Sequence, residues 1–213
     1  MGDIKNISVL IPARDDHNLL LEGVNNILST ANNPDEIEIL IKMDSDDAST
    51  ALAIPHLPAN CKTIIYPRGR GYGDLHIFYN DLGRLSIGKW LIPLAADSRM
   101  ETMNWDTEIL SIDANRPVVI WPNLSQPEYN KHFPYVSPIV SRRIFEHWGH
   151  FGLAPQIDSW LEIVSNNGGL IKLPSITVGH TRSSGDGWSQ EEWASFAPQR
   201  EVDTIKYKQL LNG

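Results

Sequence analysis

The sequence predicts an α/β fold with a mostly parallel central sheet flanked by helices. In about the first 95 residues, short apolar runs typical of buried strands alternate with segments of helical periodicity. This alternation is the pattern of parallel strands joined by right-handed helical crossovers. The chain of 213 residues, 41% hydrophobic and 21% charged, is long enough for one domain with a real core. We therefore expect a single domain over residues 1–213.

The strands and helices of the first half follow from local patterns. The run at 7–12 ends at Pro12, and a helix capped by Asp15 or Asp16 follows, with apolar residues at helical spacing up to Leu28. A loop at 32–35 precedes the second strand. The expected strands are 7–12, 36–43, 62–66 and 90–94, and a second helix is expected over 74–86.

The second half is less regular. Strands are expected at 117–121, 136–140, 170–173 and 175–178, and the segment 126–134 reads as a polar, aromatic-rich loop. Ser141 is expected to cap a helix through about Trp148. A further helix over 158–166 ends at Asn167-Gly168-Gly169, a sequence typical of helix termination. A Gly/Ser-rich loop at 179–187 and a helical or partly loose tail complete the chain.

Charge and composition exclude several classes of function. Eighteen Lys and Arg against 26 Asp and Glu give a net charge of −8, which argues against non-specific binding to nucleic acid or anionic membranes. A single cysteine, Cys61, excludes an internal disulfide framework and a thiolate zinc site. No apolar run approaches the roughly 20 residues of a transmembrane helix. We expect a soluble, intracellular protein with no nucleic-acid partner and no membrane span.

The loops that follow the predicted parallel strands are the places to look for a ligand site. These loops are Ala13-Arg14-Asp15, Asp44-Ser45-Asp46-Asp47, Arg68-Gly69-Arg70-Gly71 and Ala95-Ala96-Asp97-Ser98. Three of the four contain acids and two contain arginines. Phosphate-loop, dinucleotide, zinc-protease and serine-hydrolase motifs are absent from the sequence. The chemistry is therefore expected to come from acids and arginines at one edge of the sheet.

Each of these residues also has a purely structural interpretation. Arg14, Arg68 and Arg70 suit bidentate contacts with diphosphate oxygens, or they are solvated loop residues. Gly71 and Gly73 either let the backbone approach a ligand closely or serve as ordinary turn residues. Asp44 and Asp46 are candidate ligand contacts, or members of a helix-capping cluster in which Asp47 is the expected cap.

The order of these segments resembles the GT-A glycosyltransferases of the family-2-like kind over most of the chain. The matching segments are ISVLIPAR (7–14), EIEILIKMDSDDAS (36–49), WLIPLAADSRMETMNW (90–105), VSPIVSRR (136–143), DSWL (158–161) and VGH (178–180). Residues 71–88 stand where that family has a helix leading to its sugar-nucleotide site. More loosely, the chain resembles the N-terminal module of chlorella-virus glycosyltransferases that build capsid glycans. If the chain is viral, the expected compartment is the host cytoplasm.

The resemblance implies both a fold and an activity. The fold would be of GT-A type, with a short antiparallel extension in the second half. Residues 1–98 would form a nucleotide-binding half and residues 99–213 an acceptor-side half. The activity would be transfer of a sugar from a nucleoside diphosphate donor, UDP-linked by expectation, to a hydroxyl of a glycan or glycoprotein.

The resemblance also implies roles for particular residues. Pro12, Ala13 and Arg14 match the nucleotide loop, and Asp44 would accept a hydrogen bond from the uracil N–H with Asp46 beside it. Asp97 would ligate Mn²⁺ or Mg²⁺ with His180 as a further ligand, and Asp158 would be the acid that contacts the acceptor hydroxyl. One departure weakens the metal set, because Ala95 stands where the family has a second carboxylate.

The sequence alone leaves alternative interpretations open. Asp158 is equally readable as a helix N-cap, with Asp186 as a weaker rival for the acceptor side. His180 and Asp97 are readable as a surface histidine and a turn cap. A nucleotidyltransferase would carry a glycine-rich loop after the first strand, which Pro12-Ala13-Arg14-Asp15 is not. The missing acid at Ala95 motivates a non-catalytic sugar-nucleotide or glycan-binding module.

Overall fold

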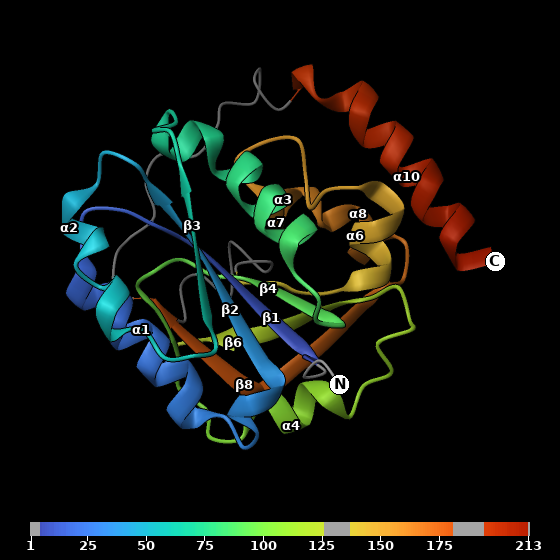
Figure 1. Cartoon of the computed structure of the whole chain (residues 1–213). Coiled ribbons are helices and arrows are strands. Elements are labelled where there is room, and N and C mark those ends of the chain that lie inside the picture. Colours follow the sequence, from blue (N-terminus) through green and yellow to red (C-terminus); the bar gives the residue numbers. More distant parts are fainter. Residues whose placement is uncertain (1–4, 126–136, 181–193, 213) are drawn as a thin grey trace.

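The computed structural model describes residues 5–125, 137–180 and 194–212, and these form one mixed sheet with helices on both faces (Figure 1). The strands are β1 (Ile7–Ala13), β2 (Ile37–Asp44), β3 (Cys61–Tyr66), β4 (Trp90–Pro93), β5 (Ser98–Met100), β6 (Val119–Leu124), β7 (Ile139–Ser141) and β8 (Leu170–His180). The α-helices are α1 (His17–Thr30), α2 (Ala48–Ala51), α3 (Leu75–Leu85), α4 (Trp105–Leu110), α6 (Arg142–Trp148), α7 (Ile157–Trp160), α8 (Glu162–Asn166) and α10 (Ala197–Asn212). Short 3₁₀ turns are η1 (Pro34–Glu36), η2 (Ile54–His56) and η3 (Gly71–Asp74).

The sheet order among these strands is β3-β2-β1-β4-β7-β6-β8-β5. The pairs β3–β2, β2–β1, β1–β4 and β6–β8 are parallel, whereas β4–β7, β7–β6 and β8–β5 are antiparallel. It follows that β7 and β5 alone run against the other described strands. The mostly parallel α/β sheet and its antiparallel extension are therefore confirmed.

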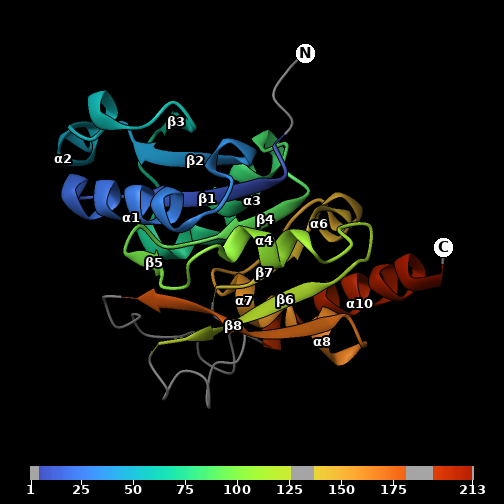
Figure 2. The ribbon, with the colours of Figure 1, turned by 90° about the horizontal axis from the view of Figure 1, so that it is seen from below.

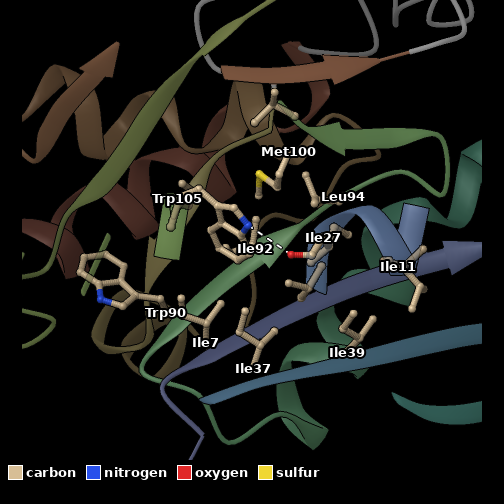
Figure 3. Packing of buried hydrophobic residues seen from close by; sticks show 14 of the residues in the cluster. Ile7, Ile11, Ile27, Ile37, Ile39, Trp90, Ile92, Leu94, Met100 and Trp105 are labelled. Atoms are coloured by element: carbon tan, nitrogen blue, oxygen red, sulfur yellow. Dashed lines mark hydrogen bonds between the residues drawn. The ribbon is translucent and has the colours of Figure 1, made fainter. Parts of the chain in front are cut away.

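The two faces of the sheet form two cores because side chains alternate along each strand. On β1, Val9 and Ile11 belong to the core that includes α1 residues and Trp105 of α4, and Figure 3 shows Ile11 and Trp105 in it. Leu10 belongs to the second core, with residues of α3 and α6. The indole Nε1 of Trp105 donates to the carbonyl of Ile27, 3.2 Å away, so α4 is tied to α1. Figure 2 shows the helices lying on the two sides of the sheet.

Several sequence predictions are corrected by the structure. The strands expected at 170–173 and 175–178 form one strand, β8, whose pairing with β6 shifts register so that Pro122 faces Leu173 while Asn123 faces Thr177. This irregularity absorbs Pro174, which has no N–H for a regular ladder. The helix expected at 158–166 is divided into α7 and α8.

Two elements had no sequence prediction. Strand β5 has three residues, which is too short for a recognisable period, and helix α4 begins after Asn104 with a left-handed φ of 58°.

Asp16 caps α1 and Asp47 caps α2, as expected, with side chains accepting from Leu19 N and Thr50 N. Ser141 occupies the N-cap position of α6 without a capping side-chain bond, because its hydroxyl accepts from Val118 N. Residues 126–136 and the loop after His180 lie outside the described residues.

Candidate active site

Six of the described strands run in one direction, so their carboxyl ends meet at a single edge of the sheet. Arg14 follows β1, Asp44 ends β2, and Arg68 follows β3. Asp97 follows β4, and His180 is the last residue of β8. The same edge of the sheet therefore carries candidate residues that are up to 166 positions apart in the sequence (14 to 180).

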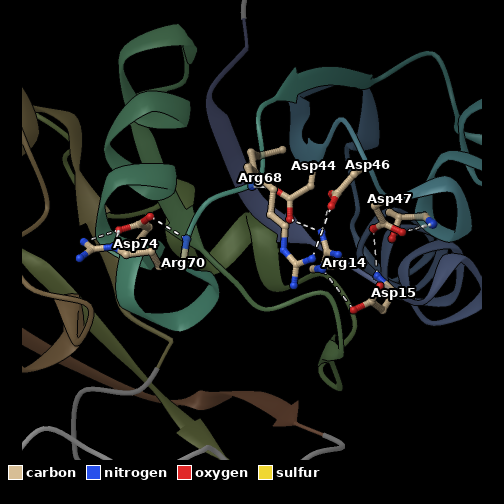
Figure 4. Close-up of polar contacts among 10 residues, drawn as sticks. Arg14, Asp15, Asp44, Asp46, Asp47, Arg68, Arg70 and Asp74 are labelled. Carbon is tan, nitrogen blue, oxygen red and sulfur yellow. Dashed lines mark hydrogen bonds and ion pairs between the residues drawn. The ribbon is translucent and has the colours of Figure 1, made fainter.

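Arg14 is the centre of an ion-pair cluster at this edge (Figure 4). Its Nη1 donates to Asp44 Oδ2 at 2.7 Å and to Asp46 Oδ1 at 2.9 Å, and its Nε lies 3.2 Å from Asp15 Oδ2. Arg68 Nη1 lies 3.5 Å from Asp46 Oδ2. The hydrogen bond from Arg14 is the main reason why the pKa of Asp46 is lowered. Two of the three candidate arginines, Arg14 and Arg68, thus meet the candidate acids Asp44 and Asp46 in one group.

Asp44 is also in contact with a buried lysine. The Lys42 ammonium, on the same strand, contacts the Asp44 carboxylate and lies 3.6 Å from the centroid of the Phe78 ring of α3. Lys42 is 3% exposed and Asp44 is 7% exposed. A buried ammonium needs a counter-charge, and here both a carboxylate and an aromatic face supply it. No sequence signal marks Lys42, because it stands at an ordinary strand position.

Asp47 connects the loops that follow β1 and β2. One of its oxygens accepts from Thr50 N at 3.0 Å, and the other accepts from Asp15 N at 2.9 Å. Asp15 has a left-handed φ of 66°, which a short polar residue tolerates when its surroundings hold it. Burial opposes ionisation of Asp47, yet these hydrogen bonds keep its pKa below the ordinary value. The Arg14 backbone is thereby fixed beside the β2 loop.

Arg70 does not join the Arg14 cluster. Its Nη2 lies 2.6 Å from Asp74 Oδ1, and its backbone N donates to Asp74 Oδ2 at 2.8 Å, which closes the turn η3 (Figure 4). Gly71 has a φ of 63°, so this turn requires its freedom from a Cβ. A Cβ at Gly71 would meet no atom within 4 Å, and one at Gly73 would meet only Arg70 Cβ, 3.7 Å away. The direct contact of Arg70, Gly71 and Gly73 with a ligand stays a prediction.

Asp97 and His180 are brought to neighbouring positions by the sheet. Strand β5 begins at Ser98, directly after Asp97, and Ser98 faces His180 in the antiparallel pairing with β8. Asp97 is 5% exposed. The buried Ser98 hydroxyl has no hydrogen-bond partner among the described residues. The Asp97 carboxylate and the Ser98 hydroxyl each offer oxygen, which is the ligand type that a hard divalent cation takes alongside phosphate and water.

No group of three His, Cys, Asp or Glu residues with metal-binding geometry occurs within the described ranges. Ala95 contributes no carboxylate to this edge. The residues present therefore fit a sparse site, in which Asp97 and Ser98 supply oxygens. Whether His180 completes that site stays a prediction.

Asp158 lies in the first turn of α7. The N-cap of this helix is Gln156, so the alternative in which Asp158 is the cap is wrong. Its Oδ1 accepts from Ser159 N at 2.9 Å. Burial raises the pKa of Asp158 to about 6. A carboxyl that titrates near neutrality is suited to exchange a proton with a hydroxyl. Asp186, its rival, lies outside the described residues.

Two tyrosines next to Asp158 had no place in the sequence prediction. Burial, and then the charges of Asp158 and Asp97, raise the pKa of the Tyr79 hydroxyl, so this phenol is within electrostatic range of both acids. Tyr79 is 6% exposed on α3. Burial and then the charge of Asp158 also raise the pKa of Tyr72. Helical periodicity marks Tyr79 only as a core residue, so its nearness to the acids needed the structure.

Asn80 attaches α3 to the segment that precedes Asp158. Its Nδ2 donates to the Gly152 carbonyl at 2.9 Å, and its Oδ1 accepts from Phe151 N at 2.7 Å. Asn80 is 5% exposed, so both bonds are sheltered from water. Helix α3 and the segment that leads to Asp158 are therefore held together by paired hydrogen bonds.

Comparison with known proteins places this architecture among glycosyltransferase folds. Mannosyltransferase PcManGT from Pyrobaculum calidifontis, solved in complex with GDP-Man and Mn²⁺, superposes with a TM-score of 0.65 at 15% identity, over 100% of this chain and 66% of that one. S. aureus TarS superposes with a TM-score of 0.70 at 12% identity, over 97% of this chain. Its fragment 1–349 gives 0.69 at 13% identity, over 97% of this chain and 69% of that one.

These likenesses establish the fold, which is that of GT-A-type glycosyltransferases. The chain spans 66% of the mannosyltransferase and 42% of TarS, so each of those proteins has further parts. No family model and no curated protein matches the sequence. None of the helices in the described ranges is both long and apolar enough to cross a bilayer.

Proposed function

We propose that this protein transfers a sugar from a nucleoside diphosphate donor to a hydroxyl of a glycan or glycoprotein, with Mn²⁺ or Mg²⁺ as cofactor. The observation that carries the proposal is the gathering of Arg14, Asp44, Arg68 and Asp97 at one sheet edge of a glycosyltransferase fold. The nucleotide-binding residues belong to 1–98, and Asp158 of 99–213 stands on the acceptor side, in keeping with two functional halves of one domain.

The chemistry assigns two tasks to the chain. Charge develops on the departing diphosphate, and Arg14 and Arg68 stand where they can exchange their carboxylate partners for phosphate oxygens. A divalent cation held by Asp97 and Ser98, with His180 as a further ligand, would supply additional neutralisation. The acceptor hydroxyl must lose a proton, and Asp158 has a pKa near the value that suits a base at neutral pH.

The donor base is assigned to uracil, with guanine as the second candidate. Asp44 and Asp46 are acceptors beside the nucleotide loop, and the single N–H of uracil between two carbonyls suits one carboxylate. Guanine offers N–H donors on one edge as well, and the mannosyltransferase of like fold was solved with GDP-Man. A nucleotide panel separates the two.

The test is a panel of UDP- and GDP-sugars with Mn²⁺ or Mg²⁺, in which release of the free nucleoside diphosphate is measured with and without glycan acceptors. Turnover of one donor that requires the metal and falls in Asp97→Ala is the expected result. Nucleotide binding without any turnover would indicate a non-catalytic binding module. If no nucleotide sugar binds, the proposed function is wrong.

A further inference from the structure

The Asp44 carboxylate is held by a different cation at each of its two oxygens. Arg14 Nη1 donates to Oδ2 at 2.7 Å (Figure 4), and the ammonium of Lys42 contacts Oδ1. The two cations differ in burial, because the Arg14 side chain is 28% exposed and the Lys42 side chain is 3% exposed. Oδ2 is therefore bound by a cation that reaches solvent, and Oδ1 by one that is enclosed in the protein.

Lys42 has little freedom to leave this oxygen. Its ammonium lies 3.6 Å from the centroid of the Phe78 ring, and a Cβ at Gly69 would lie 2.6 Å from Cζ of that ring, so the ring is packed closely against the loop after β3. A buried ammonium that gave up Asp44 would keep only the aromatic face as its counter-charge, at a cost in free energy. Arg14 is less restrained, because its partly exposed guanidinium can exchange the carboxylate for a phosphate oxygen.

This arrangement leaves one oxygen of Asp44 for the base of a nucleotide. Uracil presents a single N–H between two carbonyl groups, which one carboxylate oxygen satisfies. Guanine presents two neighbouring donors, its ring N–H and its amino group, and a carboxylate takes both when both of its oxygens face the base. We propose that Lys42 is a positioning residue that sets the preference for uracil, by keeping Oδ1 of Asp44 turned away from the nucleotide. This inference rests on the proposed function, because it concerns the donor subsite of that same site.

Removal of the Lys42 ammonium should release the second oxygen. In Lys42→Met the side chain still fills the space beside Phe78, but Oδ1 of Asp44 loses its donor. A buried carboxylate oxygen without a donor is costly, so rotation of the carboxylate toward the open side of the cluster becomes favourable. The guanine amino group then gains an acceptor. A purely structural role of Lys42 would instead change the affinities for all nucleotides by one common factor.

The test compares nucleotides that differ by one hydrogen-bond donor. Inosine diphosphate (IDP) is GDP without the amino group, so the ratio of the GDP and IDP affinities reports whether that group has an acceptor. Titration calorimetry of the full chain in Mn²⁺ measures the affinities for UDP, GDP and IDP. The matched control for Lys42→Met is Lys62→Met, which removes the lysine partner of another buried acid, Glu38, from a contact of 2.9 Å. Thermal melts establish that each variant is folded.

Wild type and Lys62→Met should bind UDP more tightly than GDP, and their affinities for GDP and IDP should agree within about twofold. In Lys42→Met the affinity for GDP should exceed that for IDP about tenfold or more, the value of one hydrogen bond to a charged group. The preference for UDP over GDP should fall by a similar factor.

Three results would overturn the role of Lys42. Wild type could bind GDP more tightly than UDP, or bind GDP about tenfold or more tightly than IDP, and neither comparison needs a variant. The third result is a set of affinity ratios in Lys42→Met equal to those in Lys62→Met. Failure of the proposed function shows differently, because wild type then binds none of the three nucleotides, and the role of Lys42 falls with it.

Discussion

The Arg14 guanidinium lies 2.7 Å from Asp44 Oδ2, while the Lys42 ammonium contacts the other oxygen of the same carboxylate. The proposed base-reading acid is therefore placed between two cations, one partly exposed and one buried. Each carboxylate oxygen has two lone pairs, so Asp44 can accept a further N–H beside these two cations. It also neutralises Lys42, so binding and folding depend on one side chain.

Replacing Asp44 by alanine tests both dependences. We expect UDP affinity to fall about tenfold or more, because a charged hydrogen-bond acceptor is lost. We also expect the free energy of unfolding to fall by about 3–5 kcal/mol, because the 3% exposed Lys42 loses its counter-charge. Titration calorimetry and urea denaturation measure the two effects.

A double variant separates these effects. In Lys42→Met/Asp44→Ala the buried charge is gone, so stability should recover most of the loss while UDP affinity stays low. Asp46→Ala is the matched control for stability, because its side chain is 46% exposed and should leave the unfolding midpoint near that of wild type. UDP affinity that is unchanged in Asp44→Ala would remove the base-reading role.

Removal of the metal is the second prediction. Donor turnover should disappear in EDTA and return with Mn²⁺ or Mg²⁺, because Arg14 and Arg68 already face carboxylates and neutralise a departing diphosphate only in part. Asp97→Ala should weaken nucleotide-dependent Mn²⁺ binding more than Ser98→Ala or His180→Ala does, since a carboxylate is the strongest of the three ligands for a hard cation. Full turnover in EDTA would leave the two arginines as the stabilisers of the leaving group.

The parallel half of the fold was predictable because its strands are continuous apolar runs and its helices have a clear period. Strand β1 differs from the prediction by one residue, and α1 has the expected cap, Asp16. The antiparallel half was harder, because its pairing is set by long-range contacts. Strand β5 is three residues long and exists through its pairing with β8. Pro174 appeared to end a strand, yet the irregular β6–β8 register accommodates it.

The site was predictable where chemistry follows a strand end. Arg14, Asp44, Asp46 and Arg68 could be grouped from the sequence, because parallel strands place their following loops at one edge. The separation of Arg70 was not predictable, since its pairing with Asp74 is a local turn interaction. The electrostatic link between Tyr79 and Asp158 was not predictable either, because nothing in the sequence relates α3 to a helix that begins 72 residues after its end (85 to 157).

Asn80 gives the third prediction. Asn80→Ala removes both hydrogen bonds to the 151–152 backbone and leaves a buried N–H and C=O without partners. We expect a loss of about 2–4 kcal/mol in unfolding free energy, taking roughly 1–2 kcal/mol for each orphaned group. Because the loop leading to Asp158 is then released, transfer should slow while UDP affinity is kept. Asp81→Ala, one position along in α3 and on an exposed ion pair, is the control and should change neither.

Asp158 gives a prediction about stability and pH. Its folded pKa of about 6 lies above the ordinary carboxyl value of about 4, so the folded state binds more protons between these two pH values. Stability should therefore fall as pH rises from about 4 through 6. Asp158→Asn removes this titration and should be more stable than wild type at pH 7.5, by up to about 3 kcal/mol. The advantage should shrink toward pH 4, which urea denaturation across this range would measure.

The same residue gives the catalytic prediction. If Asp158 accepts the proton of the acceptor hydroxyl, the wild-type transfer rate should rise with pH and level off above about pH 6, because only the ionised carboxylate can act as the base. Asp158→Asn should transfer about 10²–10⁴-fold more slowly and should lose this acidic limb, while UDP affinity stays the same. Glu162→Gln, which changes a partly exposed acid on the next helix, should keep the rate above the acidic limb, and that limb should move to lower pH because the Glu162 charge helps to raise the Asp158 pKa. A variant that is more stable and much slower would identify Asp158 as a group whose burial serves chemistry at the expense of folding. A near-wild-type rate in Asp158→Asn would instead reduce Asp158 to a structural carboxyl and direct attention to Asp186.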